Sequence, residues 1–86
     1  MSKVGRAAPT RLMAAHELLS RERPSDSAGP EVWVAYYRRS AQVYATVAEV
    51  DRGHHHEALY WSSREGRKAD EIEAGLRRRK RSGGRA

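Results

Sequence analysis

The chain contains no cysteine, which excludes disulfide bonds and thiolate metal sites as supports for its fold. It also lacks phenylalanine, and Ile72 is its single isoleucine, so an apolar core must be built largely from other residues. No apolar run approaches the roughly eighteen residues of a membrane-spanning helix, and the start from Met1 to Arg6 lacks the apolar stretch of a signal peptide. We therefore expect a cytoplasmic protein without a membrane span.

The net positive charge is concentrated at the C-terminal end. The 86 residues carry a formal net charge of +6, whereas residues 1–76 contain eleven Lys and Arg against eleven Asp and Glu. The excess comes from six cations with no acid among them, Arg77, Arg78, Arg79, Lys80, Arg81 and Arg85. Blocks of like charge stay solvated and often act as contact arms. We predict that these six residues contact the phosphates of nucleic acid without reading its sequence.

Other uses of the same cations stay open. Cations near a helix C-terminus interact favourably with the helix dipole and increase solubility. An acidic protein partner or an anionic membrane surface would also attract them. The chain contains fourteen arginines and three lysines. An excess of arginine is typical of a GC-rich genome, so part of it need not serve binding.

Hydrophobic periodicity predicts an all-α fold that starts with a short helix. This helix is expected over about residues 10–23, where the Thr10 hydroxyl can cap its first turn and Pro24 cannot continue it. Its apolar face has the i, i+3, i+4, i+7 spacing of a helix packed on one side and consists of Leu12, Ala15, His16 and Leu19.

A second, longer helix is predicted over about residues 31–52, with Pro30 at its first position. Half of its circumference is apolar or small, with Trp33, Tyr36, Tyr37, Ser40, Ala41, Val43, Tyr44, Val47, Ala48 and Val50. An arc this wide predicts contact with more than one neighbouring helix.

The segment Asp51–His54 interrupts the pattern and predicts a turn. Gly53 is expected to adopt the left-handed conformation that ends many helices. A third helix over about residues 55–79 or beyond would then pair antiparallel with the second, so that the cations at its end start as a rigid helical projection. The resulting single helical domain spans residues 9–79, between a flexible N-terminus (1–8) and a disordered basic tail (80–86). The alternative is one unbroken helix of about fifty residues that tolerates Gly53 at a cost of about 1 kcal/mol.

The expected inner face of the third helix is poor in large side chains. It consists of Ala58, Leu59, Ser62, Gly66, Ala69, Ile72 and Leu76. Small residues such as Gly66 would let the second helix approach closely. On the outer side, Glu73 and Arg77 have the favourable i, i+4 order for an ion pair.

The run His54, His55, His56 is a weak candidate for a metal site. Consecutive helical residues point about 100° apart, so the three rings cannot converge on one ion. Asp51 with His55, joined by His16, would be a better ligand set. Alternatively, the imidazoles cap carbonyl groups of the preceding helix or pack beside Trp61. We predict neither a metal nor another cofactor.

No arrangement of residues indicates catalysis. Cysteine is absent, no serine lies in a nucleophile-elbow context, and Glu57 beside His54 is an ordinary residue for the first turn of a helix. We expect a protein that is not an enzyme and has no catalytic residues.

The aromatic residues of the second helix suggest a different role. Tyr and Trp dominate protein interfaces, and an interface with a protein partner or a second copy would use Trp33, Tyr36, Tyr37 and Tyr44. The alternative is that these rings fill a core that is short of Leu and Ile.

Residues 33–69 resemble a group of small actinobacterial helical proteins in which the motif DRGHHHEALYW, here Asp51–Trp61, recurs. The resemblance implies a cytoplasmic actinobacterial protein and no particular activity. The turn also resembles the junction between tetratricopeptide repeats, with Glu57-Ala58-Leu59 opening the following helix, although Ser63 stands where that repeat favours Gly. Because only one junction is present, this similarity implies a helical hairpin and no repeat array.

Overall fold

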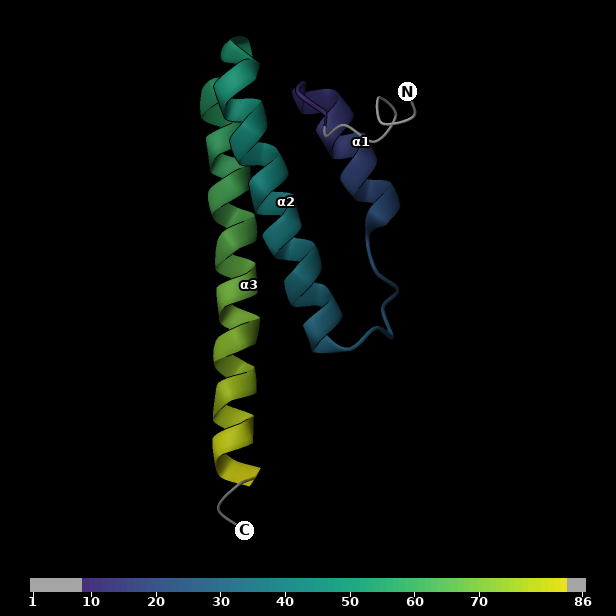
Figure 1. Ribbon diagram of the computed structural model, residues 1–86, viewed down its shortest axis with the longest axis vertical. Coiled ribbons are helices and arrows are strands. Elements are labelled where there is room, and N and C mark those ends of the chain that lie inside the picture. Colours follow the sequence, from purple (N-terminus) through teal and green to yellow (C-terminus); the bar gives the residue numbers. More distant parts are fainter. Residues whose placement is uncertain (1–8, 84–86) are drawn as a thin grey trace, which may run out of the picture.

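The computed structural model describes residues 9–83, and over this range it contains three α-helices: α1 (Leu12–Glu22), α2 (Pro30–Val50) and α3 (His55–Gly83). A single turn of 3₁₀ helix, Arg52–His54, joins α2 to α3. The two long helices lie side by side and antiparallel, and α1 packs against the half of α2 nearest their turn (Figure 1). The predicted all-α fold with a long helical hairpin is confirmed. Within residues 9–83, no helix combines the length and apolarity needed to cross a bilayer.

The core forms where the three helices meet, close to the turn. Its buried side chains are Leu12, Ala15, Leu19, Val43, Tyr44, Val47, Ala48 and Ala58, with Tyr36 and Trp61 packed against them. The predicted apolar face of α1 is therefore correct, and His16 on the same face is half-buried.

Both ends of α1 are held by groups from α2 and the turn. At its start, the Leu12 N–H donates to Asp51 Oδ2 over 3.0 Å. Near its end, the Tyr36 hydroxyl donates to the Leu19 carbonyl oxygen over 2.8 Å. The predicted cap by Thr10 is wrong, because Arg11 is the N-cap residue and no side chain of the helix's own start caps it. A short helix that is marginal alone is thus fixed by tertiary hydrogen bonds.

The turn lies where the sequence predicts it, but its conformation differs. No described glycine has a positive φ, so the left-handed Gly53 was a wrong prediction. Instead, α2 ends at Asp51 (φ −89°, ψ 77°) and the chain reverses through the 3₁₀ turn. The His55 Nδ1–H donates to the Ala48 carbonyl oxygen over 2.7 Å, so one imidazole caps α2 as one of the alternatives proposed.

The inner face of α3 is only partly as predicted. Ala58 and Ala69 are fully buried, but Leu59 is 42% exposed and Glu65, not expected inside, is only 6% exposed. Gly66 does not serve close approach, because a Cβ there would meet no neighbouring heavy atom within 4 Å.

The helix α3 continues beyond residue 79, as one interpretation of the sequence allowed. It continues to Gly83, so the first four residues of the predicted flexible tail, 80–83, are helical. Arg and Lys are good helix formers, and cations in a last turn complement the helix dipole, which accounts for the continuation. The expected flexible segment 1–8 and the remainder of the tail, 84–86, lie outside the described residues.

Two consecutive arginines of α2 link it to both neighbours. Arg38 pairs with Asp70 over 2.9 Å and also with Glu73, both on α3. Arg39 pairs with Glu22, at the end of α1, over 2.8 Å. These pairs are exposed, so their energetic contribution is small, but they neutralise both cations.

Candidate nucleic-acid interface

The C-terminal cations stand on a helix that extends past its partner. Figure 1 shows the last turns of α3 continuing beyond the start of α2 at Pro30. Arg77, Arg78, Arg79, Lys80 and Arg81 are all exposed. Because successive helical residues point about 100° apart, these five side chains surround the helix. We call this segment, Arg77–Arg81, the cationic projection. Arg85, the sixth predicted contact, lies outside the described residues.

The cationic projection has no ion-pair partner among residues 9–83. The salt bridges in this range engage Arg38, Arg39, His54 and Arg64. The pair predicted between Glu73 and Arg77 is not formed, because Arg38 on α2 takes the Glu73 carboxylate. Arg77 is thereby left available to another anion.

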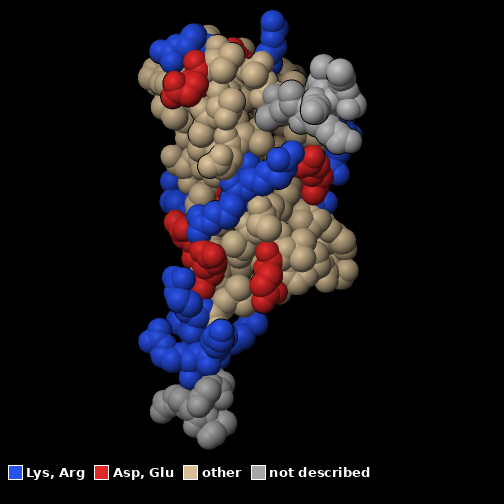
Figure 2. All heavy atoms as spheres, in the orientation of Figure 1, with Lys and Arg blue, Asp and Glu red and all other residues tan. Residues whose placement is uncertain are grey.

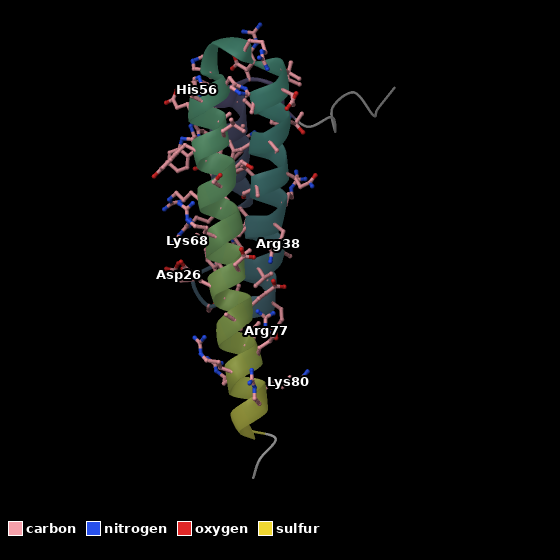
Figure 3. The ribbon with its side chains drawn as sticks, turned by 90° about the vertical axis from the view of Figure 1, so that its left-hand side faces the viewer. Asp26, Arg38, His56, Lys68, Arg77 and Lys80 are labelled. Carbon is pink, nitrogen blue, oxygen red and sulfur yellow. The ribbon has the colours of Figure 1, made fainter. Side chains whose placement is uncertain are left out.

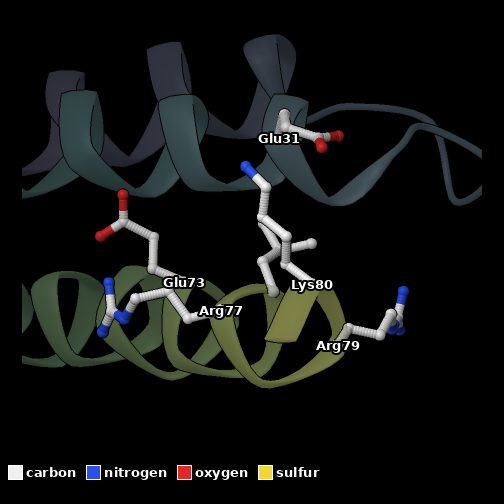
Figure 4. Close-up of a pocket in the computed structure, with 6 residues that line it drawn as sticks. Glu31, Glu73, Arg77, Arg79 and Lys80 are labelled. Atoms are coloured by element: carbon white, nitrogen blue, oxygen red, sulfur yellow. The ribbon is translucent and has the colours of Figure 1, made fainter. Parts of the chain in front are cut away.

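An open hollow of about 500 Å³ lies between the cationic projection and the start of α2. Figure 4 shows Lys80 reaching across it toward α2, with Arg77 and Arg79 on either side. Glu31, in the first turn of α2, and Glu73 also line this hollow. Acidic and basic side chains therefore both line this hollow. Farther along α3, from Arg77 to Arg81, every residue is a cation.

The rest of the visible surface differs from this end. In Figure 2, Lys and Arg atoms gather at the end from which α3 projects, whereas the body shows basic and acidic groups side by side. Figure 3 shows Arg77 and Lys80 near that end of α3, with Arg38 on the neighbouring α2. The charge separation expected from the sequence is thus also a separation in space.

The aromatic residues proposed as a partner interface are largely engaged within the fold. Trp33, Tyr36 and Tyr37 contact one another, with ring centroids 5.4–5.8 Å apart, and the Arg23 guanidinium lies 4.9 Å from the Trp33 ring centre.

Tyr44 does not belong to any such interface. It is only 4% exposed, and its hydroxyl lies 2.7 Å from His16 Nδ1. Burial, together with the nearby Glu65 carboxylate, raises the pKa of Tyr44 to about 12. The prediction that Tyr44 contacts a partner is wrong because this ring fills the junction of the three helices.

The histidines serve the turn and the core. His54 Nδ1 donates to Asp51 over 2.9 Å, so Asp51 meets His54 and not His55. His56 is exposed, and the centre of its ring lies 5.3 Å from that of the His55 ring. His16 packs edge-on against Trp61, with ring centres 5.3 Å apart. In the part of the chain that the structure describes, no three His, Asp or Glu residues are placed to hold a metal ion.

Two polar positions escaped the sequence reasoning. Asp51 holds the start of α1 through a contact 39 residues away in sequence, for which no local pattern exists. Glu65 pairs with Arg64 over 2.7 Å beside a hollow of about 250 Å³ among the helices. Its spacing, three residues after Ser62 and four before Ala69, does place it on the inner arc of α3.

Comparisons with protein-family models, with curated proteins and with solved structures find no match to this chain.

Proposed function

We propose that this chain is a non-enzymatic nucleic-acid-binding protein of the cytoplasm that contacts phosphates through the cationic projection. The observation that carries this proposal is the placement of Arg77–Arg81. Five consecutive exposed cations surround a helix beyond the end of its packing partner, and none is paired with an acid within residues 9–83.

The helical form of the projection favours binding. Cations that bind phosphates release condensed counterions, and this gain does not depend on sequence. Because α3 already holds the five side chains on an ordered backbone, less conformational entropy is lost on binding than for a loose tail. The neutral body adds no general repulsion.

Two charge-matched variants test the proposal. In the first, Arg77, Arg78 and Arg79 are replaced by Gln, which keeps the helix propensity of α3. In the second, Gln replaces three exposed arginines of the body, Arg21, Arg52 and Arg67. Binding to a labelled oligonucleotide is measured by fluorescence anisotropy. We expect the first variant to bind about 100-fold more weakly at physiological salt, the effect of three lost phosphate contacts, and the second to bind much like the wild type.

Equal losses in the two variants would contradict the proposal, because net charge alone would then explain binding. Full retention of affinity by the first variant would contradict it as well.

The alternative function, a protein-protein interface or homodimer through Trp33, Tyr36 and Tyr37, has less support. These rings already contact one another, and the Tyr36 hydroxyl is used to hold α1. Light scattering of the wild type and of Trp33→Ala tests it, since an interface built on Trp33 requires a dimer that the substitution dissociates.

A further inference from the structure

We infer that the cationic projection enters the major groove of duplex DNA end-on, in preference to duplex RNA or single strands. This inference rests on the proposed function and specifies its ligand. It follows from the shape of the projection, from the directions of its cations and from the position of the aromatic residues.

The projection has the dimensions of the groove. A helix with its side chains is about 10–12 Å across, and the major groove of B-form DNA is about 12 Å wide and 8.5 Å deep. From Arg77 to Gly83, α3 adds about 10 Å of length at 1.5 Å per residue. The cationic end of α3 can therefore reach the floor of the groove while α2 stays outside.

The directions of the cations fit a groove better than a flat surface. Arg77 and Arg79 are two residues apart in α3 and therefore point about 200° apart around its axis, while Lys80 reaches toward α2 (Figure 4). A helix inside a groove has a phosphate strand on each flank, so both arginines find partners at once. On a flat anionic surface, the cations on the far side would stay unpaired.

Other nucleic acids fit less well. The major groove of A-form RNA is deep and too narrow for a helix. Single strands are bound by aromatic side chains on which bases stack. Among residues 9–83, Tyr60 is the most exposed aromatic residue (56%). It precedes Arg77 by seventeen residues, or about 25 Å along α3, so it is too far from the cationic projection to stack on the same bases.

The acids at the base of the projection set a limit on its approach. Glu31 faces Lys80 across the hollow and would meet the phosphates at the rim of the groove. Removal of this charge should strengthen binding if the helix enters end-on. Glu49, an exposed acid at the opposite end of α2, is the matched control.

The test compares three ligands of one sequence and length, duplex DNA, duplex RNA and single-stranded DNA, with the full chain. We expect duplex RNA to bind about thirtyfold more weakly than duplex DNA, as for two lost phosphate contacts. In duplex DNA at saturating protein, dimethyl sulfate should react less with guanine N7, in the major groove, and equally with adenine N3, in the minor groove. Glu31→Gln should bind duplex DNA about fivefold more tightly, the effect of one more contact, and Glu49→Gln should not.

Several outcomes would overturn the inference. Equal affinity for DNA and RNA duplexes, unchanged reactivity at guanine N7, or identical behaviour of Glu31→Gln and Glu49→Gln would each exclude end-on entry into the groove. The proposed function would survive these results if Gln at Arg77, Arg78 and Arg79 still weakened binding by about 100-fold. Absence of binding to all three ligands would overturn both.

Discussion

Asp51 Oδ2 accepts a hydrogen bond from the Leu12 N–H over 3.0 Å, across 39 residues of sequence. The first N–H groups of a helix have no partner within the helix, and a carboxylate is a strong acceptor for them. Asp51 also receives the Nδ1–H of His54, from the same turn. One carboxylate therefore connects the start of α1 to the hairpin of α2 and α3.

Substitution of Asp51 by Asn should destabilise the fold, because α1 then loses its charged cap. The Asn side-chain oxygen can still accept the Leu12 N–H, so we expect the melting temperature to fall by roughly 3 °C, the effect of a lost negative charge at a helix start in a domain of this size. Thr10→Ala is the control, since Thr10 lies beside the same helix start and provides no cap. Equal losses in the two variants would show that Asp51 does not hold α1.

The same carboxylate should make stability depend on pH. The Leu12 N–H, and then His54, hold the pKa of Asp51 below its usual range. A lowered carboxyl pKa contributes stability above the unfolded-state value of about 4 and loses it as the pH falls through the folded-state value. The difference in melting temperature between wild type and Asp51→Asn should therefore be constant above about pH 4 and narrow below it. A difference that does not change in acid would contradict this.

The sequence predicted the helices better than the contacts between them. The apolar spacing of α1 and most of the apolar arc of α2 depend on local periodicity and appear in the structure, although Val50, predicted within that arc, is 54% exposed. The partner of Asp51 depends on how α1 is placed by tertiary packing, which no local pattern encodes. The same holds for Glu73, whose i, i+4 neighbour Arg77 loses to Arg38 on the adjacent helix.

Two serines between α2 and α3 should respond differently to Ala. The Ser62 hydroxyl donates to the Ala41 carbonyl oxygen over 2.8 Å, so Ser62→Ala should lower the free energy of unfolding by about 1 kcal/mol. Ser40 is fully buried and its hydroxyl has no hydrogen-bond partner within residues 9–83. Ser40→Ala should therefore leave the free energy unchanged or raise it. Denaturant unfolding of both variants measures the contrast, and a larger loss at Ser40 would contradict it.

Tyr44 should ionise only in strongly alkaline solution. Burial raises its pKa to about 12, and a raised pKa contributes stability below the usual tyrosine value of about 10 that is lost as the pH rises toward 12. In an alkaline absorbance titration, Tyr44→Phe should lack the step near pH 12. The same substitution should lower the free energy of unfolding by about 1 kcal/mol at neutral pH, because His16 loses its hydrogen-bond partner.

Tyr37→Phe is the control for Tyr44, since the Tyr37 hydroxyl makes no hydrogen bond within the described residues. It should keep the late titration step and the wild-type stability. If Tyr37→Phe lost the late titration step and Tyr44→Phe kept it, the assignment of this step to Tyr44 would be wrong.

Gly75 lies in α3 just before the cationic projection. Substitution of Gly75 by Ala should stabilise this helix. A Cβ at Gly75 would meet only the Arg78 guanidinium, at 3.9 Å, which is ordinary contact. Gly in a helix costs about 0.5–1 kcal/mol relative to Ala, so Gly75→Ala should raise the free energy of unfolding by that amount. Its affinity for duplex DNA should be maintained or increased, because the projection becomes stiffer. Weaker binding by this more stable variant would contradict a helical projection as the binding element.

Part of the candidate site was visible in the sequence and part was not. The cations from Arg77 to Arg81 were evident from charge counting, because a block of like charge needs no tertiary context. Their exposure on all sides was not evident, since it depends on where α2 begins relative to α3. The availability of Arg77 depends on the contact between Arg38 and Glu73, which only the packed hairpin creates.

The salt dependence of binding tests the central claim most directly. Affinity for a duplex DNA is measured over a range of salt concentrations for the wild type and for the chain with Gln at all five positions of the projection. Five phosphate contacts predict a slope of log affinity against log salt of about −4.5 for the wild type and near zero for the variant. A wild-type slope near zero, or equal slopes for the two proteins, would show that the cationic projection does not bind nucleic acid.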